Sequence, residues 1–194
     1  ADIFHHRPLI ECEFAMRLGR SLDPGMSFDS VAEAVAMADA VAPALELVDG
    51  RYDSQLGIDG PSVVADNSMA TAVVLGEPLD LDPDRHGRRL ADMTVRLVAA
   101  DPDDNGDGSA PGDGDGELIT QGAGSNVLGD PWRSFRWALQ HLTARGLVAA
   151  AGTWVITGSC AGAPVAPLNR RLTAHFDDLG AVSLTITDRR RSTA

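Results

Sequence analysis

Two glutamates stand two positions apart near the start of the chain, at Glu11 and Glu13. Side chains at this spacing on an extended strand share one face, about 6.5–7 Å apart, so a single cation can draw both carboxylates inward. A third glutamate, Glu46, lies on a later strand-like segment. Three carboxylates would suit Mg²⁺ or Mn²⁺ and leave positions for a small anionic 2-oxo acid and water. A solvated strand face is the competing interpretation, and from spacing alone it is the commoner one.

The segments that must position these glutamates are predicted as two strands with a helix between them. Residues 9–18 alternate between apolar and polar side chains, which is typical of a strand. The apolar spacing over residues 31–41 predicts an amphipathic helix, with Ser27 and Asp29 as capping groups. Residues 44–48 then form a short strand that carries the third glutamate.

The rest of the chain is rich in predicted strands, at residues 70–75, 93–99, 118–121, 154–157 and 182–186. Residues 131–145 have the apolar spacing of a second main helix, which Gly146 ends. Between the second and third of these strands lies an acidic, Gly-rich insertion, residues 101–116, which we predict to be flexible. Many strands with two main helices favour the α+β class.

Composition restricts the classes of protein that this chain can be. With 194 residues, of which 44% are hydrophobic, residues 1–194 are expected to form a single domain. A formal net charge of −12 argues against a nucleic-acid partner, because phosphate binding needs a basic face. No apolar run approaches the roughly 20 residues of a membrane span, and no secretory signal is recognisable. We therefore expect a cytoplasmic protein with no membrane partner.

Two further residue types bear on chemistry. Cys12 and Cys160 lie far apart in apolar segments, which favours buried free thiols over a disulfide or a metal pair. The chain contains no lysine, so its side chains cannot carry out Schiff-base chemistry.

Five short segments follow one another along almost the whole chain: 10–15 (IECEFA), 43–51 (PALELVDGR), 64–67 (VADN), 122–131 (GAGSNVLGDP) and 157–162 (TGSCAG). Their order and spacing resemble the 2-keto-4-pentenoate hydratase pattern of the fumarylacetoacetate hydrolase superfamily. The resemblance implies a mixed β-roll, a homo-oligomer, and a Mg²⁺ or Mn²⁺ ion held by Glu11, Glu13 and Glu46.

The resemblance also implies a reaction. In that family the metal chelates the 2-oxo and carboxylate oxygens of the substrate and stabilises an enolate before water adds to the conjugated double bond. The expected activity is a hydro-lyase acting on a 2-hydroxydienoate or 2-oxoenoate, such as 2-keto-4-pentenoate in aromatic catabolism. The alternatives are a related 2-oxo-acid decarboxylase or C–C hydrolase on the same fold, or a truncated non-catalytic paralogue.

The chain departs from the family pattern just after one of the five segments. Asp66 and Asn67 match the Ala-Asp-Asn block of the family and are expected to line the site. A hydroxyl residue often follows that block, but here Met69 occupies its place and Ser68 comes one position early.

A second departure concerns proton transfer. Family members usually carry a catalytic lysine in an N-terminal region, and this chain, which begins at Ala1, supplies none, so we expect an N-terminal portion to be missing. His5 and His6, just before the first predicted strand, are then the candidates for proton transfer. An exposed terminal pair is the competing interpretation of these histidines.

Overall fold

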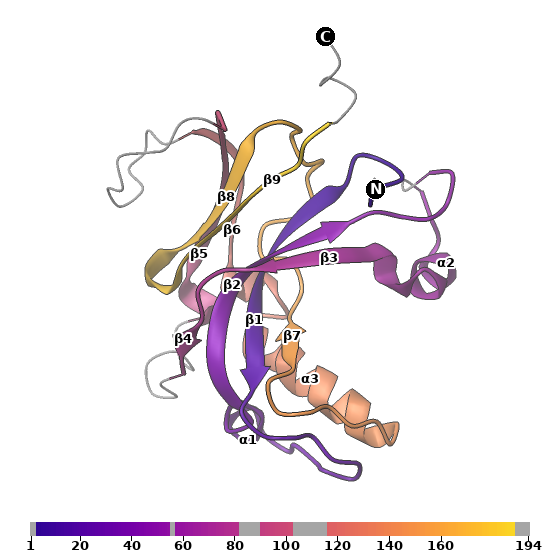
Figure 1. Ribbon diagram of the computed structural model, residues 1–194. Coiled ribbons are helices and arrows are strands. Elements are labelled where there is room, and N and C mark those ends of the chain that lie inside the picture. The colour runs from indigo at the N-terminus through magenta and orange to yellow at the C-terminus, as the bar shows by residue number, and fades with distance from the viewer. Residues whose placement is uncertain (1–2, 55–56, 82–89, 103–115, 189–194) are drawn as a thin grey trace.

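The computed structural model describes residues 3–54, 57–81, 90–102 and 116–188, which form two curled antiparallel sheets and a small number of helices (Figure 1). The first sheet has the order β3-β2-β1-β7, with β4 also paired to β2. Its strands are β1 (Leu9–Leu18), β2 (Ala38–Val48), β3 (Ala70–Leu75), β4 (Leu79–Asp80) and β7 (Trp154–Ile156). The second sheet has the order β6-β5-β8-β9. Its strands are β5 (Thr94–Ala100), β6 (Glu117–Ala123), β8 (Arg171–Phe176) and β9 (Gly180–Thr185).

The core lies between the two sheets. The predicted strand at residues 9–18 is confirmed, and every second side chain along it is buried: Ile10, Cys12, Phe14, Met16 and Leu18. From this face of β1, the ring of Phe14 packs edge-on against Phe176 of β8, with the ring centroids 5.1 Å apart. Both cysteines are free and buried, as the sequence predicts.

The prediction of a helix over residues 31–41 is correct for residues 31–35 and wrong for the residues after them. Helix α1 spans only Val31–Val35, and β2 begins at Ala38. The N-cap is Ser30, whose hydroxyl and Glu33 form a capping box, rather than Ser27 or Asp29. Residues from Ala38 onward pair with β1 along its whole length, and these backbone hydrogen bonds outweigh the helical spacing of the apolar residues.

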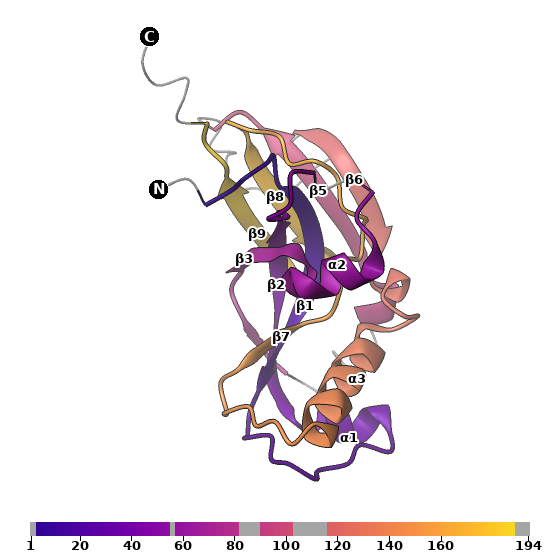
Figure 2. The ribbon, with the colours of Figure 1, turned by 90° about the vertical axis from the view of Figure 1, so that its right-hand side faces the viewer.

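The one long helix of the described chain is α3, Pro131–Ala144, which confirms the second predicted helix. Asp130 caps its N-terminus by accepting the Trp132 backbone N–H at 3.0 Å. Its buried side chains include Trp132, Phe135 and Leu139. The short helix α1 lies beside α3 (Figure 2), where Arg136 donates to the Phe28 carbonyl at 2.6 Å.

In the second sheet, the strands predicted at residues 93–99 and 118–121 appear as β5 and β6, which pair in antiparallel register. Residues 103–115 of the predicted flexible insertion lie outside the described residues. Strand β8 was not predicted from the sequence, although its buried residues Leu172, Ala174 and Phe176 alternate with partly exposed ones in the period of a strand. Within the described ranges, no helix has the length and apolar character needed to cross a bilayer.

Candidate metal centre

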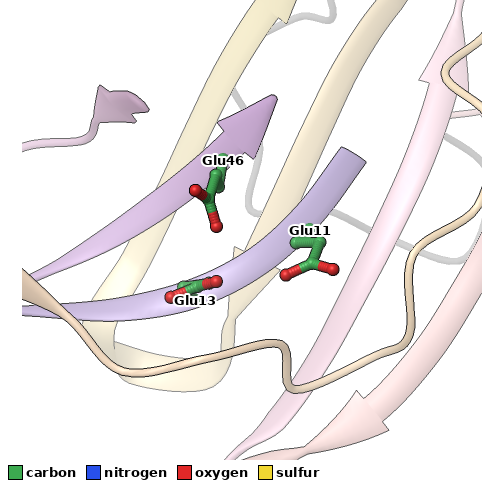
Figure 3. A group of neighbouring side chains, drawn as sticks. All are labelled: Glu11, Glu13 and Glu46. Carbon is green, nitrogen blue, oxygen red and sulfur yellow. The ribbon is translucent and has the colours of Figure 1, made fainter. Parts of the chain in front are cut away.

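Three glutamates from two neighbouring strands meet on one face of the first sheet (Figure 3). In the antiparallel register of β1 and β2, Glu11 lies opposite Glu46, and Glu13 follows two positions along the same face of β1. Carboxylate oxygens, one from each residue, all lie within 4.8 Å of one another. The structure therefore brings together the three residues that the sequence suggests as metal ligands.

These carboxylates are largely removed from water. Glu13 has 1% of its surface exposed, and Glu11 and Glu46 are partly buried. Burial raises the pKa of Glu46, and burial together with the charge of Glu46 raises the pKa of Glu11. Burial is also the main reason that the pKa of Glu13 rises to about 9, and the other two carboxylates add to the effect. The cluster is therefore poorly suited to carrying three negative charges by itself.

A divalent cation fits this arrangement. Mg²⁺ and Mn²⁺ prefer hard oxygen ligands, and a bound cation would compensate the repulsion among the three buried carboxylates. In the part of the chain that the structure describes, no other group of three or more His, Cys, Asp or Glu side chains comes this close together. The donor chemistry and the burial of Glu11, Glu13 and Glu46 thus both suit a metal site.

The loop after β7 orients the most buried of the three carboxylates. The backbone N–H of Gly158 donates a hydrogen bond to Glu13 Oε2 at 2.6 Å. Gly158 has a φ of 105°, in the left-handed region that glycine tolerates best. The hydroxyl of Thr157 donates to the Phe14 carbonyl at 3.1 Å and so attaches this loop to β1. The first residues of the 157–162 segment therefore position Glu13.

A cavity of about 400 Å³ opens beside the glutamates. Sites for small molecules typically measure about 300–1,000 Å³. In addition to the three glutamates, it is lined by Leu9, Val48, Val63, Ser68, Met69, Ile156 and Gly158. The carboxylate cluster thus faces a space large enough for a small organic acid.

An unusual turn forms one wall of this cavity. It follows helix α2 (Gly60–Ala65) and contains three successive non-glycine residues with positive φ, namely Asn67 at 53°, Ser68 at 57° and Met69 at 59°. A left-handed backbone costs about 1–2 kcal/mol per residue other than glycine, somewhat less for asparagine. Such strain persists only where surrounding contacts impose it, and it is often found at functional sites.

The contacts that impose the turn come from Arg51 and Asp49, which follow β2. The Arg51 guanidinium pairs with the Asp66 carboxylate at 2.7 Å and also donates to the Ala70 carbonyl at 3.2 Å. The Asp49 backbone N–H donates to the Met69 carbonyl at 2.9 Å. Both sides of the turn are therefore attached to the end of the strand that carries the third glutamate.

Asp66 and Asn67, which the sequence suggests as site residues, are not among the residues that line the cavity. The carboxylate of Asp66 accepts hydrogen bonds from the Arg51 side chain and backbone, which lower the pKa of Asp66. In the structure, Asp66 anchors the turn and Asn67 begins it. Their neighbours Ser68 and Met69 are the residues that face the cavity.

His5 and His6 are also outside the cavity lining. Their backbone N–H groups both donate to the buried carboxylate of Asp49. The His6 ring lies 2.7 Å from the Tyr52 carbonyl oxygen, measured from Nε2. The structure thus attaches the segment before β1 to the end of β2, and it places neither imidazole against the carboxylate cluster.

Sequence reasoning missed four residues of the cavity wall: Leu9, Val48, Val63 and Ile156. Val63 and Ile156 belong to elements far from the glutamates in sequence, and apolar side chains carry no local signal that separates a cavity wall from a core. Gly158 did carry a signal, because it belongs to one of the five segments of the family pattern.

No protein-family model matches the chain. A 4-oxalocrotonate decarboxylase of Pseudomonas putida is 30% identical over 177 residues, which cover 91% of this chain and 59% of that protein. A 2-keto-4-pentenoate hydratase of Burkholderia vietnamiensis is 29% identical over 184 residues, covering 94% of this chain and 62% of the relative. The chain thus spans about three fifths of the length of the curated relatives that it matches.

Solved structures show the same fold. The 4-oxalocrotonate decarboxylase of Pseudomonas putida complexed with magnesium and adipate has a TM-score of 0.72 and 28% identity, over 92% of this chain and 60% of that one. A maleylpyruvate hydrolase from a Sphingobium species shares the fold at a TM-score of 0.62 and 14% identity, over 94% of this chain and 56% of that one.

These likenesses define a class of enzymes with curled antiparallel sheets and few helices. The α+β class expected from the sequence is confirmed, although only one of its two predicted main helices is long. The chain belongs to the fumarylacetoacetate hydrolase superfamily, and its relatives include both decarboxylases and hydratases.

Proposed function

We propose that this chain is a metal-dependent hydro-lyase that adds water to a 2-hydroxydienoate or 2-oxoenoate, with Mg²⁺ or Mn²⁺ held by Glu11, Glu13 and Glu46. The observation that carries the proposal is the convergence of these carboxylates within 4.8 Å beside a cavity of about 400 Å³. The hydratase relatives and the magnesium complex of the solved decarboxylase support it.

The bound cation would supply Lewis-acid stabilisation of negative charge on the 2-oxo end of the substrate. Other residues of the chain orient the carboxylates that would hold the cation and shape the cavity beside them. The Gly158 N–H fixes Glu13 Oε2, and the apolar side chains of Leu9, Val48 and Ile156 restrict water on the walls beside the carboxylates.

Proton transfer by His5 and His6, and contact of Asp66 and Asn67 with the substrate, stay predictions. Because none of the four lines the cavity, each would have to act from beside it. The double change of His5 and His6 to Ala tests the first of these. An active wild type with a variant that turns over at the same rate would refute the histidine role. A homo-oligomer, a cytoplasmic location and a role in aromatic catabolism are likewise proposals.

Decarboxylation is the second candidate. Three decarboxylases of Pseudomonas are 25–31% identical to this chain, and the solved decarboxylase superposes with a TM-score of 0.72. C–C hydrolysis remains a further alternative on this fold. A non-catalytic paralogue is favoured by two features of the sequence, the absence of lysine and the presence of Met69 where the family often has a hydroxyl residue.

Turnover of two compounds separates the hydratase, the decarboxylase and the non-catalytic paralogue. Purified protein with Mg²⁺ is given 2-hydroxypenta-2,4-dienoate, the ultraviolet loss of the dienol is followed, and the product is identified. A hydrated 2-oxo acid supports the hydratase, whereas release of carbon dioxide from 4-oxalocrotonate supports the decarboxylase. Cation binding without turnover of either compound favours the non-catalytic paralogue. Glu46→Gln should abolish the activity, while the exposed Glu77→Gln should not.

A further inference from the structure

The residues that line the cavity beside the metal centre fall into two chemically different groups. One group is the acidic cluster of three glutamates. The other, which we call the apolar wall, consists of Leu9, Val48, Val63, Met69 and Ile156. Ser68 and Gly158 add uncharged polar groups, and none of the described residues that line the cavity is an Arg or a His.

From this division we infer that the site selects 2-oxo monocarboxylates with an uncharged tail and discriminates against 2-oxo dicarboxylates. The inference rests on the proposed function, in which Glu11, Glu13 and Glu46 would hold a cation that stabilises negative charge on the 2-oxo end of the substrate. With that end held at Glu11, Glu13 and Glu46, a tail that stays within the cavity meets the apolar wall, because the other lining residues are few.

A second carboxylate would be poorly accommodated there. It would exchange water for aliphatic side chains, with no cationic partner among the described lining residues. It would also lie in the same cavity as three glutamates, and placing like charges together in such a site disfavours binding. A methyl or vinyl tail meets neither obstacle and gains contact with Val63, Met69 and Ile156.

The apolar wall is held in place by the fold. Val63 lies on α2, whose N-cap Asp59 accepts the Ser62 backbone N–H at 2.9 Å. Met69 ends the left-handed turn that Arg51 and Asp49 attach to β2. Because the Asp59 cap holds α2, and the Arg51 side chain and the Asp49 backbone hold the turn, the wall is preorganised around whatever tail it accepts.

The contrast with a relative makes the inference specific. The solved decarboxylase was obtained with adipate, which is a dicarboxylate. A wall lined by aliphatic side chains favours the opposite class of ligand for this chain, and with it hydration of a monocarboxylate over decarboxylation of a dicarboxylate.

The test measures binding by calorimetry with the full chain and Mg²⁺. Three probes are compared: pyruvate, 2-oxohexanoate, and 2-oxoadipate, which matches 2-oxohexanoate in carbon number but ends in a second carboxylate. We expect 2-oxohexanoate to bind at least about tenfold more tightly than 2-oxoadipate. Equal affinities, or a preference for 2-oxoadipate, would overturn the inference. Pyruvate tests the proposed function separately, because loss of its Mg²⁺-dependent binding would show that the 2-oxo end is not held at all.

A matched pair of variants locates the selectivity. Val63→Arg places a cation on the apolar wall and should bring the two affinities together, whereas Val64→Arg, at a neighbouring position that is 75% exposed, should leave their ratio unchanged. Circular dichroism and pyruvate binding establish that each variant is folded and holds the 2-oxo end. If Val63→Arg fails to fold, Met69→Arg tests the same wall. A folded, pyruvate-binding wall variant with the wild-type ratio would refute the role of the wall.

Discussion

Replacing Glu13 by glutamine should stabilise the metal-free protein at neutral pH and at the same time weaken the binding of Mg²⁺. The buried Glu13 carboxyl has a pKa of about 9 in the folded chain, against an ordinary value of 4.5. The folded state therefore holds a proton that the unfolded state releases once the pH exceeds about 4.5. Glutamine has the shape of the protonated acid, and its carbonyl can still accept the Gly158 N–H.

The magnitude follows from this difference in proton binding. A group whose pKa is raised by folding contributes its full stability below the unfolded pKa, and loses it as the pH rises towards the folded pKa. Wild-type stability should thus fall relative to Glu13→Gln by up to about 1.4 kcal/mol per pH unit between roughly pH 5 and 9. At pH 7 the variant should be more stable by about 2–3 kcal/mol, with the titration shared among the three neighbouring carboxyls.

Urea unfolding in the presence of a chelator, at pH 5, 7 and 8, measures the effect. Glu77→Gln, at an exposed glutamate, is the control and should follow the wild type at every pH. Addition of Mg²⁺ should then raise the stability of the wild type and have little effect on Glu13→Gln, because binding to the native state alone stabilises it. A variant less stable than wild type at pH 8 without metal, or a difference that does not grow with pH, would refute the argument.

Three further outcomes test other parts of the structure. The affinity for Mg²⁺ should rise between about pH 5 and 9, because the cation competes with protons on carboxyls whose pKa values burial has raised. Binding should therefore release protons. Calorimetry in buffers of different ionisation enthalpy measures the number of protons released. Trp132→Ala should cost about 3–5 kcal/mol of unfolding free energy, since the ring is fully buried, whereas Trp137→Ala on the exposed face of α3 should cost far less. Ser68→Gly should stabilise the protein by about 0.5–1 kcal/mol, since glycine adopts the φ of 57° without strain, and a loss of stability on urea unfolding would show that the hydroxyl makes a stabilising contact.

The local sequence pattern was sufficient to predict β1 and to place two of the three glutamates on one face of it. The alternation of apolar and polar residues over 9–18 is a property of the segment itself, because side chains of a strand alternate between two faces whatever the strand pairs with. The same period places Glu11 and Glu13 on one face. Helix α3 could also be predicted from the sequence, since its capping residue, apolar spacing and terminal glycine all indicate a helix with the same ends.

Resemblance to a family pattern supplied what spacing could not. Glu46 stands far from the other two glutamates along the chain, and only the register of β2 against β1 sets it opposite Glu11. That register depends on backbone pairing over the whole length of both strands, which no local pattern records. The same pairing converts residues from Ala38 onward, whose apolar spacing suits a helix, into a strand.

The shape of the cavity was decided by tertiary structure alone. Residues 67–69 contain no glycine, so nothing in their sequence predicts three successive left-handed residues. The Arg51–Asp66 ion pair and the hydrogen bond from Asp49 impose that conformation from another element. They direct Ser68 and Met69, rather than Asp66 and Asn67, towards the glutamates. Side-chain types could therefore indicate which ligands a metal might find here, but the residues that meet its substrate were determined by contacts between segments distant in sequence.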